Sequence, residues 1–320
     1  MPALSGYEEK YFNGYKVDKE NDDVVYSDEQ HVYLDKTDCQ KYISVTSLIH
    51  KYSNEFDSSF WSAYKALEAI LEESVWLSVK SGLLAKKKFN PELLIKLNID
   101  KEVFENKQKE ILAEYDRKRD ESCVRGTAIH AQFEESFYGK SRFDFKRFGF
   151  EEVSDCDFTC KKDYYKLDLT HGVYPEFLIS CKSEDGLLRL SGQIDCLILD
   201  GNDAMILDFK TNKEIKKSGY FDKVKKSKQT LKYPLNHLDD CNFNIYQMQL
   251  STYAYMLQTL RPEIKIKKLM LYHIDHDGNE TLYECQYLKK EVIRMLNHYK
   301  KSIKVQQQLD KNKPVKLSIC

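Results

Sequence analysis

The sequence has no apolar run long enough to cross a membrane. No part of its 320 residues approaches the ~18 consecutive apolar residues of a transmembrane helix. The N-terminal segment MPALSGYEEKYFNG carries early acidic residues and has neither the apolar centre of a secretory leader nor an Arg-rich amphipathic face. We therefore expect a soluble, cytoplasmic protein without a membrane partner.

Paired cysteine motifs are also absent. The nine cysteines include no CxxC pair, and an odd number without framework spacing indicates reduced thiols in an intracellular compartment. A structural zinc or iron–sulfur site has no local ligand cluster to support it. The phosphate-binding pattern GxxxxGK[ST] does not occur, so no ATP-driven motor is predicted on this chain.

Charge of one sign is not in excess. The 50 basic and 51 acidic side chains leave a formal net charge of −1, which does not exclude nucleic acid as a partner because the distribution of charge matters more than its sum. A hydrophobic content of 42% and an aromatic content of 12% are typical of a folded chain with a sizeable core. The length allows one large domain or two modest ones.

The first half of the chain changes from strand-like to helix-like patterns. Residues 31–35 (HVYLD) and 41–46 (KYISVT) alternate and predict a hairpin, after which Ser44 or Thr46 caps a short helix that reaches Tyr52. From residue 56 the apolar positions recur at helical spacing, at Trp61, Tyr64, Leu67, Ile70 and Leu71.

Further helices are expected up to residue 138. Pro91 marks a break that is followed by a short helix, and the good helix formers of 102–121 predict a charged helix. We expect a separate helix from about Gly126 to Tyr138.

The second half of the chain has the pattern of strands. Turn residues at 200–203 (DGND) and 277–279 (DGN) predict hairpins. The expected strands are 158–169, 173–182, 187–199, 204–209, 265–275 and 280–288, and the expected helices are 244–260 and 289–308. This order predicts an α/β or α+β core behind a helical N-terminal region. We expect an N-terminal tail and hairpin over 1–55, a helical region over 56–125 and the core over 126–320.

Two carboxylates and a lysine meet on the hairpin SGQIDCLILDGNDAMILDFKTNKE (191–214). Asp208 and Lys210 are two residues apart and therefore project from the same face of a strand, and the hairpin places Asp195 beside them. Two carboxylates on one face are costly unless they are neutralised, and hard oxygen ligands suit Mg²⁺. A bound ion polarises a phosphate and activates water, and Lys210 then stabilises negative charge in the transition state. The alternative is a solvated Asp-containing turn with a surface ion pair.

Other polar residues stand at positions that need an explanation. His130, in RGTAIHAQFEE (125–135), shares a helical face with Glu134, although a lone helical histidine is more often structural. Glu176 is an acid in the middle of the apolar segment VYPEFLI. Gln249 and Tyr253 lie four residues apart on a helix, where the alternative is the polar edge of an amphipathic helix.

The ordered set GTAIH, Glu176, GQID, LDFKT and QLSTY resembles the RecB-type branch of the PD-(D/E)XK nucleases. The set is similar to the nuclease domains of bacterial recombination helicases, CRISPR adaptation nucleases, the mitochondrial genome maintenance exonuclease and phage exonucleases. It covers residues 120–260 most strongly. The resemblance implies a restriction-endonuclease-like fold, a central mixed sheet flanked by helices. It also implies that the helical region 56–125 serves as an arch that threads DNA, and suggests a phage source and a host cytoplasm.

The resemblance also implies the role of each residue. His130, Asp195, Asp208 and the Phe209 carbonyl hold the metal ion, Glu176 binds the metal or a water, and Lys210 is the catalytic lysine. Gln249 and Tyr253 contact substrate phosphate. The ion is Mg²⁺, for which Mn²⁺ substitutes. The cysteines that hold an iron–sulfur cluster in some relatives are absent, so no cluster is expected.

A lysine-rich segment follows the catalytic lysine. Between Lys210 and Lys232 there are nine lysines and two acids, interleaved with aromatic residues. Lysines bind phosphate without regard to sequence and aromatics stack on exposed bases, so Lys213, Lys216 and Lys217 are expected to bind substrate at the mouth of the site. The alternative is a solvated loop. A second run, Lys86–Lys88, is interpreted as an ordinary surface run.

These observations predict a Mg²⁺-dependent DNA exonuclease in recombination, repair or replication, acting on single strands or free ends. A separate helicase, recombinase or single-strand-binding protein is a possible partner of such an enzyme. The alternatives are a structure-specific endonuclease of the same fold and a DNA-binding or interaction protein that does not cleave. Joint retention of His130, Asp195, Asp208 and Lys210 argues against the last.

Overall fold

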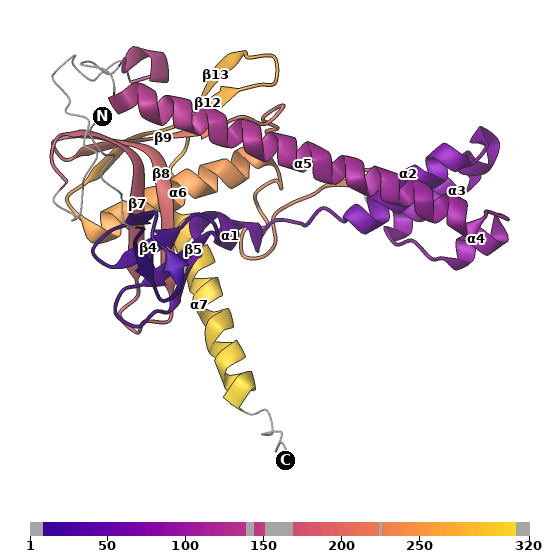
Figure 1. The fold of residues 1–320 in the computed structure, drawn as a ribbon, viewed down its shortest axis with the longest axis horizontal. Helices are drawn as coiled ribbons and strands as arrows, with labels where there is room; N and C mark the ends of the chain where they lie inside the picture. The colour runs from indigo at the N-terminus through magenta and orange to yellow at the C-terminus, as the bar shows by residue number, and fades with distance from the viewer. Residues whose placement is uncertain (1–8, 139–143, 151–168, 224–225, 312–320) are drawn as a thin grey trace, which may run out of the picture. The chain divides into compact units, whose positions relative to one another are not determined.

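The computed structural model describes residues 9–138, 144–150, 169–223 and 226–311 (Figure 1). The chain divides into two compact units. The sheet unit consists of Met1–Ser53, His130–Gly219 and Thr230–Cys320, and the helical unit consists of Asn54–Ile129 and Tyr220–Gln229. None of the described helices combines the length and the apolar character that a bilayer crossing requires.

The centre of the sheet unit is a mixed sheet built around β8 (Arg189–Asp200). β7 (Gly172–Lys182) and β9 (Asp203–Lys210) run antiparallel to β8, and the pairing of β8 with β9 is the one predicted from the turn that joins them. β12 (Lys265–Ile274) runs parallel to β9, and β13 (Glu280–Cys285) pairs antiparallel with β12 at the edge. Both predicted hairpins of the second half are confirmed.

The N-terminal strands extend the same sheet. β3 (Lys19–Glu20), β4 (Val24–Ser27), β5 (Val32–Asp35) and β6 (Lys41–Ser44) form an antiparallel series, and β6 pairs in parallel with the start of β8. A separate pair is formed by β1 (Tyr11–Phe12) and β2 (Tyr15–Lys16). The predicted division at residue 55 therefore needs correction, because strand pairing joins the N-terminal hairpin to the core.

Helices cover both faces of the sheet. On one face lie α1 (Val45–His50), α6 (Asn242–Leu260) and α7 (Lys289–Lys311), which bury Ala204 and Ile206 of β9. Ser44 caps α1 by accepting a hydrogen bond from the N–H of Ser47, as predicted. The opposite face buries phenylalanines of α5 and of the short helix η1 (Lys146–Phe148) against Met205 and Leu207. Alternation along β9 thus gives each face its own core.

The helical unit has its own apolar core. α2 (Ser58–Ile70), capped by Asp57, packs with α3 (Glu73–Lys86), the short α4 (Glu92–Lys96) that follows Pro91, and the first part of α5. The core residues include Phe60, Tyr64, Leu67, Trp76 and Phe104. A small hairpin of β10 (Phe221–Asp222) and β11 (Ser227–Lys228) belongs to the same unit.

Helix α5 is one continuous helix, Lys101–Tyr138, and the prediction of two helices here is wrong. Gly126 is its only internal breaker, and one glycine costs only about 1 kcal/mol, too little to end a helix that is already propagating. The predicted boundary at residue 125 therefore falls inside α5, and the two units meet in the chain at Ile129 and His130. The strand expected at 158–169 lies outside the described residues apart from Leu169.

Candidate active site

The alternation of side chains along β7 is interrupted at one point. Tyr174 packs into the core that contains α6 before Glu176, and Phe177 packs into the same core directly after it. Glu176 itself has a left-handed backbone with φ of 49°, which is strained by roughly 1–3 kcal/mol for a residue with a side chain. The pairing of β7 with β8 continues on both sides of Glu176, so Glu176 is the one residue of β7 that is left out of the regular register.

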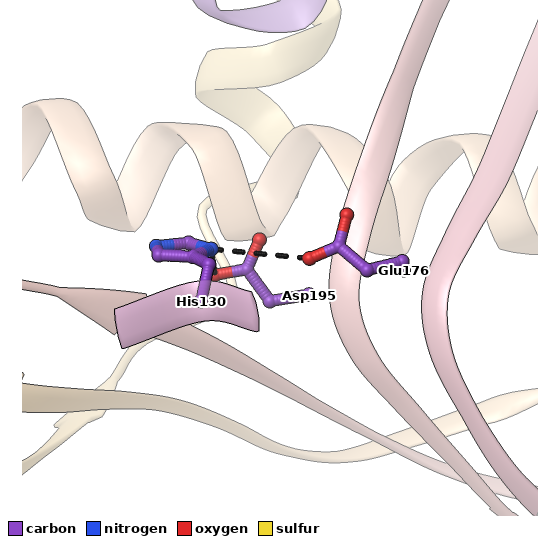
Figure 2. A group of neighbouring side chains, drawn as sticks. All are labelled: His130, Glu176 and Asp195. Atoms are coloured by element: carbon purple, nitrogen blue, oxygen red, sulfur yellow. Dashed lines mark ion pairs between the residues drawn. The ribbon is translucent and has the colours of Figure 1, made fainter. Parts of the chain in front are cut away.

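Three ligand-type side chains converge beside this interruption (Figure 2). The imidazole Nδ1 of His130, from α5, lies 3.6 Å from Asp195 Oδ2 of β8 and 3.9 Å from Glu176 Oε1 of β7. One donor atom from each of the three lies within 4.8 Å of the other two. Such spacing is that of groups able to share one ion.

The strands β8 and β9 separate at the same place. Their ladder ends at the pair Cys196 and Leu207, and two residues further along β9 the N–H of Phe209 donates to Asp195 Oδ2 at 2.7 Å. His130 Nε2 lies 3.2 Å from the Phe209 carbonyl. The side chain of Phe209 is buried and stacks on Phe133 of α5 with ring centroids 4.2 Å apart, which holds α5 against the end of β9.

Asp208 and Lys210 form a second group that is held by α6. Lys210 Nζ lies 2.6 Å from Asp208 Oδ2 and donates to Gln249 Oε1 at 3.3 Å. The amide of Gln249 donates to Asp208 Oδ1 at 3.1 Å and to the Tyr253 hydroxyl at 3.5 Å. Gln249 therefore fixes the catalytic-type lysine and its carboxylate together, and Tyr253 supports the amide.

Lys210 also lies over an aromatic ring. Its Nζ is 4.6 Å from the ring centroid of Tyr246, which stands three residues before Gln249 on α6. Burial opposes the charged amine, but the charges of Asp208 and Asp195 outweigh it and raise the pKa of Lys210. The lysine is therefore cationic at neutral pH, a state that serves electrostatic stabilisation and not proton abstraction.

The charged side chains of the site shift one another's pKa values. Burial and the nearby charge of Asp208 raise the pKa of Asp195 to about 7. Burial works against the imidazolium of His130, but Asp195, Glu176 and Asp208 raise its pKa to about 9. A proton on His130 thus compensates for carboxylates that a cation would otherwise neutralise.

Lys19 was missed by the sequence analysis. Its Nζ lies 3.3 Å from Glu176 Oε2, so β3 brings a second lysine to the site. Burial favours the neutral acid, but the contacts with His130 and Lys19 prevail and lower the pKa of Glu176. No local pattern around Lys19 marks it. Tyr246 was missed as well, although its spacing of three and seven from Gln249 and Tyr253 places it on their helix face.

The donor set fits a divalent cation. Two carboxylates and an imidazole converge, and the Phe209 carbonyl and the Asp208 carboxylate adjoin them. Oxygen donors of this kind suit Mg²⁺ or Mn²⁺, which also relieves the repulsion among the acids. Glu176 takes part in the convergent group, whereas Asp208 is held by Lys210 and Gln249.

Gly192 and Gln193 lie next to Asp195 on β8. A Cβ on Gly192 would lie 2.8 Å from Cε1 of Tyr253, so only glycine lets α6 approach this closely. The side-chain nitrogen of Gln193 is buried and has no hydrogen-bond partner among the described residues. The motif GQID is thus coupled to the motif QLSTY by direct packing.

The lysines expected to bind substrate lie on the connection that follows β9. Lys213 is exposed, and Lys216 forms an ion pair with Glu214 at 3.0 Å. Lys217 lies over the rings of Phe243 and Tyr283, 5.2 and 4.9 Å from their centroids. None of the three has a described contact with the convergent acids.

Comparison with known proteins identifies the class. Residues 65–313 match the PD-(D/E)XK nuclease superfamily, and the chain belongs to this superfamily. Its mixed α/β fold, with a central mixed sheet flanked by helices and a helical N-terminal region, is the fold expected from the sequence. The protein is therefore a nuclease, and the superfamily acts on DNA with divalent metal ions.

Two solved structures are similar over most of their length. The protein SSO0001 is 13% identical, with 87% of this chain and 80% of that chain covered and a TM-score of 0.33. A protein from Eubacterium rectale named "Putative exonuclease" is 11% identical, with 87% and 85% covered and a TM-score of 0.31. A comparison with curated sequences finds no significant match.

Proposed function

We propose that the protein is a Mg²⁺-dependent DNA exonuclease that acts on single strands from free ends. The observation that carries the chemistry is the convergence of His130, Glu176 and Asp195 beside the group of Asp208 and Lys210. End-dependence is supported by the ordered motifs, which resemble the RecB-type branch. Recombination, repair or replication is the setting in which such an enzyme acts, together with a separate helicase, recombinase or single-strand-binding protein.

The residues divide the work of phosphodiester hydrolysis. His130, Asp195, Asp208 and the Phe209 carbonyl would hold the divalent ion, and Glu176 would bind the ion or a water. A bound ion would supply polarisation of the scissile phosphate and a lower pKa for water. Lys210, cationic and held by Gln249, orients the attacking water and stabilises the charge that develops on phosphate. Gln249 and Tyr253 are proposed to contact substrate phosphate, as the resemblance implies.

Lys213, Lys216 and Lys217 supply sequence-independent attraction for the phosphate backbone. All three follow Lys210 within seven residues and are carried by the sheet unit. Their contribution is expected in the salt dependence of binding and not in the chemical step.

A cleavage assay tests this function. End-labelled linear single-stranded DNA is incubated with wild-type protein in Mg²⁺, Mn²⁺ or EDTA, and with Lys210→Ala. We expect metal-dependent cleavage that falls at least about 10²–10³-fold in Lys210→Ala, because a preorganised charge is removed from the transition state. Lys267→Ala, on the neighbouring strand β12, is the matched control and should cleave normally.

A closed single-stranded circle separates the alternatives. An exonuclease leaves the circle whole, whereas cutting of the circle assigns the protein to the structure-specific endonucleases of this fold. DNA binding without cleavage in either metal would favour the interaction protein and refute the proposal.

A further inference from the structure

The lysine-rich segment after Lys210 is divided between the two units. Its first part belongs to the sheet unit, whereas Tyr220–Gln229 belongs to the helical unit. There Phe221 pairs with Lys228 and Asp222 with Ser227 in the β10–β11 hairpin. The hairpin exposes Tyr220 and Phe221, at 54% and 52% of their surface, while Asp222 is buried.

Lys87 joins this hairpin to the second lysine run. Its Nζ lies 3.2 Å from Asp222 Oδ2 and 5.5 Å from the ring centroid of Tyr220. Lys87 ends α3 in a left-handed conformation, with φ of 46°, and its N–H donates to the Leu83 carbonyl. Two lysine clusters that are more than 130 residues apart in the sequence therefore meet on one surface, and Lys86–Lys88 is not an isolated surface run.

We call this the lysine–aromatic surface. It consists of Lys86, Lys87, Lys88, Tyr220, Phe221, Lys223, Lys226 and Lys228. Six of these residues are lysines, and the carboxylate of Asp222 in the hairpin already pairs with Lys87. A hollow of about 300 Å³ adjoins the run on α3, and the charged residues that line it are Lys86, Lys88, Lys96 and one acid, Glu92. Positive charge is thus concentrated in a chain that is nearly neutral.

We propose that the lysine–aromatic surface is a binding site for single-stranded DNA that works without the metal centre. Exposed aromatic faces between lysines are the arrangement that stacks unpaired bases while the amines bind phosphates. A duplex hides its base faces, so it would use only the lysines. The identity of the ligand as DNA rests on the proposed function, whereas the preference for single strands rests on Tyr220 and Phe221.

This surface would bind substrate without taking part in catalysis. Loss of the two aromatic side chains is expected to raise KM for long single strands and to leave kcat unchanged. Very short oligonucleotides, which occupy the metal site alone, should be cut at the wild-type rate. A role limited to the stability of the hairpin would not produce this split.

Binding in EDTA tests the proposal directly. Fluorescence anisotropy with a labelled 30-nucleotide oligo-dT compares the full-length wild-type protein with the double variant Tyr220→Ala/Phe221→Ala. Stacking is worth about 1–3 kcal/mol per base, so the loss of even one stacked base should increase Kd roughly 5- to 150-fold, and the loss of two should increase it further. Lys223→Ala/Lys228→Ala should reduce the salt slope by about 0.7 for each phosphate that the variant no longer neutralises. Tyr233→Ala is the matched control, because this tyrosine is 71% exposed but belongs to the sheet unit.

The outcomes are separable from those of the cleavage assay. Unchanged oligo-dT affinity in the double aromatic variant, in a protein that still cuts DNA, would overturn this site and leave the nuclease intact. An equal loss on duplex and single strand would overturn the stacking argument. A third outcome is that the wild-type protein binds oligo-dT but never cuts DNA, and that the aromatic variant does not bind. This outcome would support the surface and refute the proposed function. Failure of wild-type protein to bind oligo-dT would assign the surface to another kind of partner and refute the proposal.

Discussion

The proposed metal centre in the sheet unit and the lysine–aromatic surface in the helical unit differ in how their charged groups are placed. The charged groups of the centre are largely enclosed and tied to named partners: Asp208 is 1% exposed and lies between Lys210 and Gln249. The surface presents exposed lysines and rings, with only Asp222 buried. Bond cleavage needs catalytic groups that are held in fixed positions. Binding of a flexible nucleic-acid strand needs a high density of positive charge and flat apolar faces.

Removal of one carboxylate should separate the two regions most sharply. Asp195→Asn is expected to reduce cleavage at least about 10²–10³-fold, because it removes a charged oxygen from the centre. Oligo-dT affinity in EDTA should not change. The metal-free variant should unfold at the same or a higher temperature, because the raised pKa of Asp195 shows that its charge is unfavourable there.

Asp200→Asn, at the end of the same strand, is the control and should retain activity. Cleavage by Asp195→Asn at the wild-type rate would remove this residue from the centre. Weakened EDTA binding would show instead that the two regions are not independent.

Two glycines give stability changes of opposite sign. In the sheet unit, Gly192→Ala should lower the free energy of unfolding by about 1–3 kcal/mol, because its Cβ would lie 2.8 Å from the Tyr253 ring. In the helical unit, Gly82→Ala should raise it by up to about 1 kcal/mol, because Gly82 is inside α3 and its Cβ would meet nothing within 4 Å. Chemical denaturation of both variants measures the two changes in the free energy of unfolding.

Cleavage should follow the same division. Gly192→Ala displaces Tyr253, the support of Gln249, and should lower kcat, whereas Gly82→Ala should not. Equal stability of the two variants would contradict the close packing of β8 against α6.

The pH dependence of the unfolding temperature should be a smaller effect, and it should come from the proposed metal centre. In metal-free protein, protonated His130 stabilises the fold below about pH 6.5, and this contribution is lost as the pH rises through about 9. The pKa of Asp195 is raised, so protonated Asp195 also stabilises the fold. This stabilisation decreases between about pH 4 and 7 and is lost above pH 7. Between pH 6.5 and 9 the unfolding temperature should fall, by about 2–4 °C for each kcal/mol lost.

Saturating Mg²⁺ should flatten this dependence, because the ion replaces the protons. His130→Gln should flatten it too, whereas His237→Gln, on the surface of the same unit, should not. A slope that persists in both the Mg²⁺-bound protein and His130→Gln would place its origin outside the centre.

Local rules were sufficient to predict the hairpin that contains Asp195, Asp208 and Lys210. The DGND turn and the alternation around it predicted β8 and β9 and placed Asp208 and Lys210 on one face. Those same rules marked Glu176 as an acid in an apolar strand but did not predict its direction, because its left-handed backbone breaks the alternation on which they depend. They also failed for α5, where the weak preference of one glycine lost to the propagation of a long helix.

The sequence by itself determined the strand and helix types, the superfamily and the order of the motif residues, because these depend on neighbours in the chain. Only the tertiary structure decided that Lys19 reaches Glu176, that Tyr253 packs on Gly192, and that Lys87 meets Asp222. Each of these contacts joins residues at least 60 positions apart. Such contacts form when sheet pairing and core packing bring distant segments together, and no local backbone preference encodes them.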